Sequence, residues 1–195
     1  MRFIMAGAIC LLIGMAAGCH SAKVANPLTD KLAGNEPDSQ IEFWHTLAER
    51  PLTSNDEAFH GILLYADGED PAKDYAGRVE LLKSRKMLPP NFSGAADQAV
   101  LRGDLAVAIC QVLHHKGGLV NRMVGGRVPR YAVRELQYIE VYPPSTPRQT
   151  FSGAEFIGIV GRIEDYQRGN SADVPATVLP GEMNKAPTTA PSHNK

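Results

Sequence analysis

The sequence lacks several features that would mark a particular function. Its 195 residues carry a formal net charge of −1, so neither a basic nucleic-acid-binding chain nor an acidic solvating chain fits. It contains no P-loop, no G-x-S-x-G nucleophile elbow and no dinucleotide fingerprint. With 44% hydrophobic and 21% charged residues, its composition is that of an ordinary globular protein. We therefore expect no enzyme, no cofactor and no nucleic-acid partner.

The sequence also lacks a hydrophobic run of membrane-spanning length, and one shorter apolar run lies at the start of the chain. Arg2 precedes an apolar stretch over residues 3–15, which is shorter than the roughly 20 residues that a membrane-spanning helix needs. The stretch ends on the small residues Ala16, Ala17 and Gly18, directly before Cys19. This pattern predicts an export signal over residues 1–18.

The end of that signal resembles the lipobox of bacterial lipoproteins, although Ala16 replaces the leucine that this family usually has. The resemblance implies that Cys19 carries lipid, including palmitate, and holds the protein on the exported side of a bacterial membrane. His20 is not the aspartate associated with inner-membrane retention, so the resemblance favours the outer membrane. An ordinary secretory signal or a plain membrane anchor remains the alternative.

Cysteine is scarce, and this limits how the fold is stabilised. Of the three cysteines, Cys10 lies in the predicted signal and Cys19 at the predicted lipidation site, which leaves Cys110. No intramolecular disulfide is then available to the exported domain, so the fold must depend on its apolar core. Cys110 lies in an apolar run, which predicts a buried, inert thiol.

Composition divides the rest of the chain into three parts. Residues 19–40 are small and polar, which predicts a flexible tether, and residues 169–195 form a Pro/Thr/Ala-rich segment without aromatic residues, which predicts a disordered tail. The folded domain should occupy residues 41–168, a normal size for one core.

A repeat organises that domain. A pattern of apolar residues and a proline pair recurs at an offset of 54, and two apolar helical segments then follow at an offset of 51. Ser54 with Glu57 and Ser152 with Glu155 form capping boxes at helix starts, and Asp104 opens the corresponding helix of the middle copy. The sequence predicts an all-α fold of three helix-loop-helix units, at residues 41–67, 73–115 and 129–166. The residues matched at offset 54 are Val79, Leu82, Met87, Leu88, Pro89 and Pro90 with Val133, Leu136, Val141, Tyr142, Pro143 and Pro144.

These units resemble surface-layer homology (SLH) domains, whose second helix opens on a Thr-Arg-Ala-Glu-like motif. The matching segments are residues 101–104, 152–155 and, most weakly, 54–57. The resemblance implies three modules packed into one unit that binds envelope or cell-wall polysaccharide. Only Arg102 stands at the arginine position of the motif, since Gly153 and Asn55 replace it in the other copies. The alternative is a structural lipoprotein that docks another envelope protein and binds no glycan.

Acidic residues are absent between Asp104 and Glu135, and this stretch is basic instead. It could hold an anionic glycan, a phosphate or a lipid headgroup, or it could be a solvated connector that ends a helix. Together with Arg102, which we expect to be exposed, its basic residues are the candidate ligand-binding set: Lys116, Arg122, Arg127, Arg130 and Arg134.

The other titratable residues favour structural roles. His114 and His115 are adjacent and would point in different directions on a helix, so we expect no metal site there. His45 and His60 fall in different predicted helices. The acidic cluster from Asp67 to Asp74 contains Gly68 and Pro71, which indicates the end of one helix and the start of the next.

Overall fold

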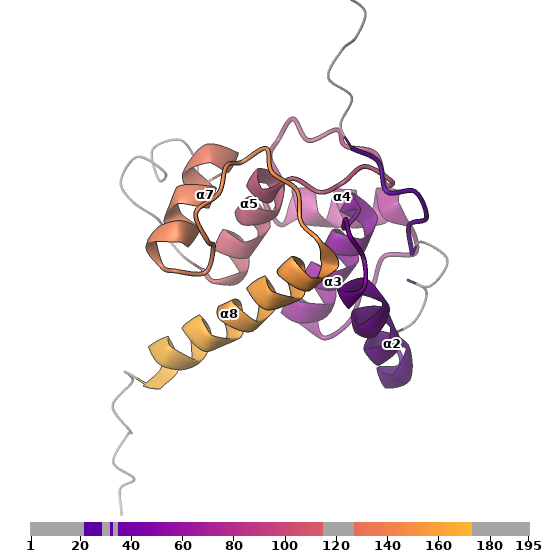
Figure 1. Cartoon of the computed structure of the whole chain (residues 1–195), viewed down its shortest axis with the longest axis horizontal. Helices are drawn as coiled ribbons and strands as arrows, with labels where there is room; N and C mark the ends of the chain where they lie inside the picture. The colour runs from indigo at the N-terminus through magenta and orange to yellow at the C-terminus, as the bar shows by residue number, and fades with distance from the viewer. Residues whose placement is uncertain (1–21, 29–31, 33–34, 115–126, 173–195) are drawn as a thin grey trace, which may run out of the picture.

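The computed structural model describes residues 22–28, 32, 35–114 and 127–172. Within these residues the fold is all-α, as predicted, and the only β pairing is two isolated bridges. The helices are α2 (Pro37–Ala48), α3 (Asn55–Asp67), α4 (Tyr75–Ser84), α5 (Arg102–Val112), α7 (Pro129–Tyr138) and α8 (Gly153–Ala172) (Figure 1). No helix among the described residues is both long and apolar enough to cross a bilayer.

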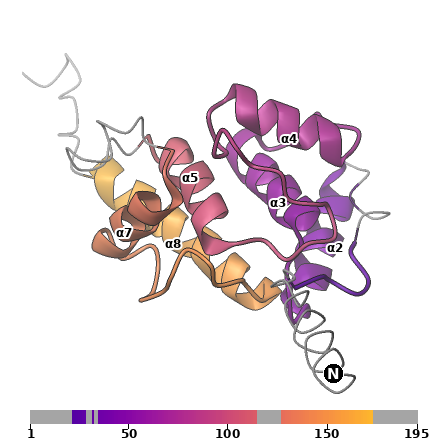
Figure 2. The same ribbon diagram turned by 90° about the horizontal axis from the view of Figure 1, so that it is seen from above.

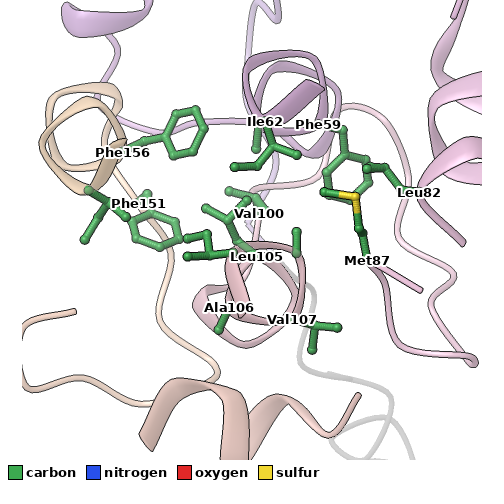
Figure 3. Packing of buried hydrophobic residues seen from close by; sticks show 14 of the residues in the cluster. Phe59, Ile62, Leu82, Met87, Val100, Leu105, Ala106, Val107, Phe151 and Phe156 are labelled. Atoms are coloured by element: carbon green, nitrogen blue, oxygen red, sulfur yellow. The ribbon is translucent and has the colours of Figure 1, made fainter. Parts of the chain in front are cut away.

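Helices α3 and α5 form the centre of the molecule. Every side chain from Asn55 to Leu64 on α3 is buried, and α5 is buried along almost its whole length. A helix enclosed on all sides shows little separation of apolar and polar faces. Figure 3 shows Phe59 and Ile62 of α3 near Val100 and Leu105, with Phe151 and Phe156 on one side and Leu82 and Met87 on the other.

The other helices surround this pair. Helix α7 packs along α5, α4 packs against α3, and α2 contacts α8 (Figure 2). Their burial is one-sided: α7, for example, buries Ala132, Val133 and Leu136 and exposes Arg130 and Arg134. The predicted inward face of the first helix is confirmed, because Phe43 and Leu47 are buried and Trp44 packs against the core.

Backbone hydrogen bonds join the segments that lead into α3, α5 and α8. Thr53 N donates to Phe151 O at 2.9 Å, Val100 N donates to Thr53 O at 3.0 Å, and Arg102 N donates to Gln149 O at 2.8 Å. The N-terminal ends of these three helices are therefore held together. Partial positive charge at helix N-termini favours acidic side chains, so carboxylates gather in this part of the molecule.

Local sequence signals set the helix boundaries. Both predicted capping boxes are present: Ser54 N donates to Glu57 Oε2 at 2.7 Å, and Ser152 N donates to Glu155 Oε2 at 2.9 Å. The predicted break after α3 is also confirmed, because Gly68 caps it with φ of 78° and Asp74 then caps α4 by accepting from Gly77 N. Glycine suits the Gly68 position because it adopts positive φ without steric cost.

Two predicted boundaries are wrong. Part of the predicted tether is packed on the domain: Val24 and Leu28 are buried, and Val24 N donates to Asp97 O at 2.8 Å. These residues pack on the domain because they pair with the segment before α5, and the polar composition of residues 19–40 does not indicate this contact. In addition, α2 begins at Pro37, inside that tether, and α8 continues to Ala172, inside the predicted tail.

The free thiol of Cys110 is buried, as predicted. Desolvation by burial, with a smaller contribution from Glu135, raises its pKa to about 12. The thiol is therefore protonated at neutral pH and has the character of a small core side chain.

Candidate functional site

Arg102 is buried, so the expectation that it is exposed is wrong. Only 7% of the residue is accessible. Its Nη2 atom donates to Glu155 Oε1 at 2.7 Å and its Nε atom donates to Thr150 O at 3.2 Å. The guanidinium group also lies 4.7 Å from the centre of the Phe151 ring. These contacts fix α5 to the start of α8 and direct the guanidinium toward α8.

The remaining candidate cations lie apart from Arg102. Arg130 and Arg134 are exposed one turn apart on α7, and Arg127 is half-buried just before that helix. Tyr138, which is 85% exposed, follows Arg134 by four residues on the same helix. Lys116 and Arg122 lie outside the described residues. The structure thus brings Arg130 and Arg134 together on one face, while Arg102 turns toward α8.

Arginines also neutralise the acidic N-terminus of α3. Arg78 Nη1 donates to Asp56 Oδ1 at 2.7 Å, and Arg50 Nε lies 3.8 Å from Glu57 Oε1. Arg102 on α5 likewise pairs with Glu155 near the start of α8. The carboxylates at the starts of α3 and α8 therefore have basic partners.

Asp104, at the start of α5, is different. Among the described residues, no ion pair and no side-chain hydrogen bond reaches its carboxylate. The residue at the cap position is Leu101, whose side chain has no oxygen to offer, so α5 has no side-chain cap. Burial raises the pKa of Asp104 to about 6. A half-buried carboxylate that has no ion-pair partner among the described residues is an uncommon arrangement, because no charge on those residues offsets the cost of desolvation.

The Asp104 side chain lines a cavity of about 400 Å³, which we call the loop pocket. Its walls come from the 89–101 loop, the start of α3 and the start of α7. Ligand pockets in proteins are typically about 300 to 1,000 Å³. Of the described residues that line it, Asp104 alone is ionisable, and the rest of its polar lining consists of amides and a hydroxyl, from Asn55, Asn91, Ser93 and Gln98.

Hydrogen bonds from α3, from α4 and within the loop itself fix the position of the 89–101 loop. Asn55 Nδ2 donates to Ala95 O at 2.8 Å, and the Tyr75 hydroxyl donates to Gly94 O at 2.6 Å. Ala95 N donates to Gln98 Oε1 at 3.2 Å. A Cβ atom at Gly94 would lie 2.6 Å from Asn55 Nδ2, so glycine lets the loop pass this close to α3. The pocket is consequently built into the fold and does not depend on a single exposed side chain.

A second polar cluster lies buried between α3 and α4. His60 Nδ1 and Asp70 Oδ2 are 2.6 Å apart, and Arg78 bonds both Asp70 and Asp56. Burial by itself would raise the pKa of Asp70, but hydrogen bonds from His60 and Arg78 outweigh it and hold that pKa below its usual value. Because these groups pair with one another and are buried, the cluster is a structural clamp. The sequence placed Asp70 in a turn and gave no signal of its partners.

A larger cavity of about 700 Å³ lies near the C-terminal ends of α3 and α5. Its central polar groups already bond to one another: Arg85 pairs with Asp67, and the Tyr65 hydroxyl donates to Gln167 Oε1 at 2.7 Å. Its edge at His114 adjoins residues outside the described part of the chain. The loop pocket is therefore the stronger candidate site.

Within the described residues, no group of three or more His, Cys, Asp or Glu side chains is placed to hold a metal ion. No protein-family model matches this sequence, and no curated protein or solved structure is significantly similar to it. The candidate site consequently depends on its own geometry and chemistry.

Proposed function

We propose that this chain is a lipid-anchored cell-envelope protein whose helical domain binds envelope or cell-wall polysaccharide. The observation that carries this proposal is the loop pocket, with its half-buried carboxylate and its lining of amides and a hydroxyl. Such groups donate and accept hydrogen bonds in the way that sugar hydroxyls require.

Helix spacing supports two matched units of the proposed SLH-like arrangement. Helices α4 and α7 each have ten residues and begin 54 residues apart, at Tyr75 and Pro129. Helices α5 and α8 begin 51 residues apart, at Arg102 and Gly153. Lys86 and Glu140, which follow α4 and α7, both have φ of 61°. We infer units at residues 41–67, 73–115 and 129–166, with the glycan site retained only in the middle one.

The binding test uses the full chain carrying Cys19→Ser, so that lipid does not interfere. We expect this protein to cosediment with purified insoluble envelope polysaccharide. Asn91→Ala and Ser93→Ala should weaken cosedimentation several-fold, because both side chains are exposed at the pocket and can be shortened without disturbing the core. Asp165→Asn, on the exposed surface of α8, is the matched control. Failure of the parent protein to cosediment at low salt would refute the proposed function.

One observation favours the alternative, a structural lipoprotein that docks another envelope protein. The buried pairing of Arg102 with Glu155 removes the cation that an SLH-type anionic sugar would require. Under this alternative, pull-down from solubilised envelope recovers one stoichiometric protein whose retention is insensitive to added glycan. Under the glycan proposal, added polysaccharide competes with retention.

A further inference from the structure

We propose that the loop pocket binds a ligand through a positively charged amine, such as the free ammonium group of an amino sugar, with Asp104 as its anionic partner. This inference rests on the proposed function and specifies the ligand class of the same pocket. It reverses the expectation of an anionic sugar held by arginine.

The first observation behind this proposal is the pattern of ion pairs at the starts of α3, α5 and α8. At the start of α3 and of α8, each acidic side chain lies near an arginine supplied by another segment of the fold. At the start of α5, Asp104 has no such arginine among the described residues. A ligand cation would supply the charge that the chain supplies elsewhere.

A helix-capping role does not explain why Asp104 has no arginine partner among the described residues. Glu57 and Glu155 each accept a hydrogen bond from the backbone N–H of the cap residue three positions earlier. Asp104 makes no such bond to Leu101, and its side chain is one methylene shorter. Interaction with the helix dipole offsets only part of the cost of burial, so this carboxylate remains available to a ligand.

The composition of the pocket carries the second step. Its other polar groups are neutral, so the described lining has a charge of −1 when Asp104 is ionised. An ammonium group has three N–H donors and no acceptor. The Asp104 carboxylate can accept one of them, and amide oxygens such as that of Asn91 at the pocket can accept others. A neutral hydroxyl would make a hydrogen bond there but would leave the charge unpaired.

Most charged groups on the neighbouring elements are paired or exposed, and on α4 the exposed Lys83 donates from Nζ to Phe92 O at 2.8 Å. Asp56 on α3 is bound by Arg78, and Asp97 in the 89–101 loop is bound by Lys23 at 2.7 Å. Tyr75 on α4 has a pKa raised by burial and by the negative charges of Asp56 and Asp104, so it stays protonated. Arg130 is exposed on α7, next to Pro129 of the pocket, where solvent screens its charge. Asp104 is therefore the group whose charge controls the pocket near neutral pH.

The test compares two sugar oligomers of equal length, one of glucosamine and one of N-acetylglucosamine, by calorimetry with the Cys19→Ser chain. We expect the glucosamine oligomer to bind at least tenfold more tightly at pH 6.5, where most of Asp104 is ionised and much of the amine is still charged, since amino-sugar amines lose their proton near neutral pH. At pH 5.0 its affinity should fall several-fold as Asp104 takes up a proton, although the amine is then fully charged. Asp104→Asn should abolish both the preference for the amine and the fall at pH 5.0, and Asp165→Asn should change neither.

The outcomes separate this inference from the proposed function. If both oligomers bind equally and Asp104→Asn binds like the parent, the ammonium site is refuted while polysaccharide binding stands. If the glucosamine oligomer does not bind, the ammonium site is refuted, and cosedimentation with envelope polysaccharide decides the proposed function independently. Circular dichroism of Asp104→Asn checks that the variant is folded, which separates loss of the preference from unfolding.

Discussion

At the scale of single residues, the two halves of one sequence motif have opposite roles. Arg102 is buried and paired, whereas Asp104, two residues later, is half-buried and has no ion pair among the described residues. A residue that stabilises the fold and a residue that costs stability thus lie within one helical turn. Substitutions at the two positions should separate stability from binding.

Asp104→Asn should stabilise the protein at neutral pH. The pKa of Asp104 in the folded state, about 6, is above its ordinary value of 3.8, so the folded state holds the proton more tightly than the unfolded state does. The resulting stabilisation is present below about pH 4 and is lost as pH rises through 6. Asparagine carries no charge, so Asp104→Asn removes the cost of the partly buried carboxylate. The substitution should raise the free energy of unfolding at pH 7.5 by about 1 kcal/mol, allowing for solvent screening. Urea denaturation at pH 4.5 and 7.5 measures it, and destabilisation at both pH values would contradict our account.

Arg102→Ala should lower the free energy of unfolding by about 2 kcal/mol. This is less than the loss expected for a fully buried ion pair, because the Glu155 side chain is 52% exposed. Arg102→Lys should retain only part of the stability that Arg102→Ala loses, since lysine cannot donate to Glu155 and to Thr150 O with the same planar geometry. Thermal denaturation checks both variants. Full stability of Arg102→Ala would show that the ion pair does not hold α5 to α8.

At the scale of elements, the junction between α2 and α8 depends on one close backbone contact. Gly153 N donates to Arg50 O at 2.9 Å, and a Cβ atom at Gly153 would lie 1.6 Å from Leu47 O. Gly158, five residues along the same helix, has nothing within 4 Å of such an atom. The two glycines therefore test packing and helix propensity separately.

Gly153→Ala should cost about 3 kcal/mol or more, because the backbone of α2 must move to admit the methyl group. Gly158→Ala should be neutral or should stabilise by about 0.5 to 1 kcal/mol through helix propensity. Denaturant midpoints of the two variants provide the comparison. Equal effects at both positions would argue against the close contact.

Elements also show what sequence can and cannot predict. The starts of α3 and α8 and the end of α3 were predicted because a cap uses residues within one turn, as at Ser54, Gly68 and Ser152. The pairing of Arg102 with Glu155 joins residues 53 positions apart, and no local pattern encodes it. The burial of Val24 and Leu28 was missed for the same reason, since their partners lie far along the chain.

The candidate site was likewise only partly predictable. Asp104 was recognised as the residue that opens a helix, but whether an arginine lies beside it depends on the folded arrangement, and none of those described pairs with it. The amides of the loop pocket come from three separate places, at Asn55, Asn91 and Gln98, and only the folded chain brings them together. The basic stretch of the sequence instead predicted ligand-binding residues that include Arg130 and Arg134, and these two lie exposed on α7.

At the scale of the whole molecule, the proposed lipid on Cys19 would keep the domain near a membrane surface, where envelope polysaccharide is concentrated. Cys19→Ser should move the protein from the membrane fraction to the soluble fraction, because acyl chains supply about 0.8 kcal/mol per buried methylene and the chain has no excess of basic residues. Fractionation followed by immunoblotting measures this. Retention in the membrane fraction after the substitution would exclude the lipid anchor.

The central claim is that the loop pocket binds polysaccharide through Asp104, and binding isotherms on purified envelope polysaccharide test it most directly. The chain carrying Cys19→Ser should bind at pH 7.5, and adding Asp104→Asn should weaken binding at least tenfold while leaving the protein folded and more stable. Equal binding by the two proteins, or weaker binding explained by lower stability, would contradict the account.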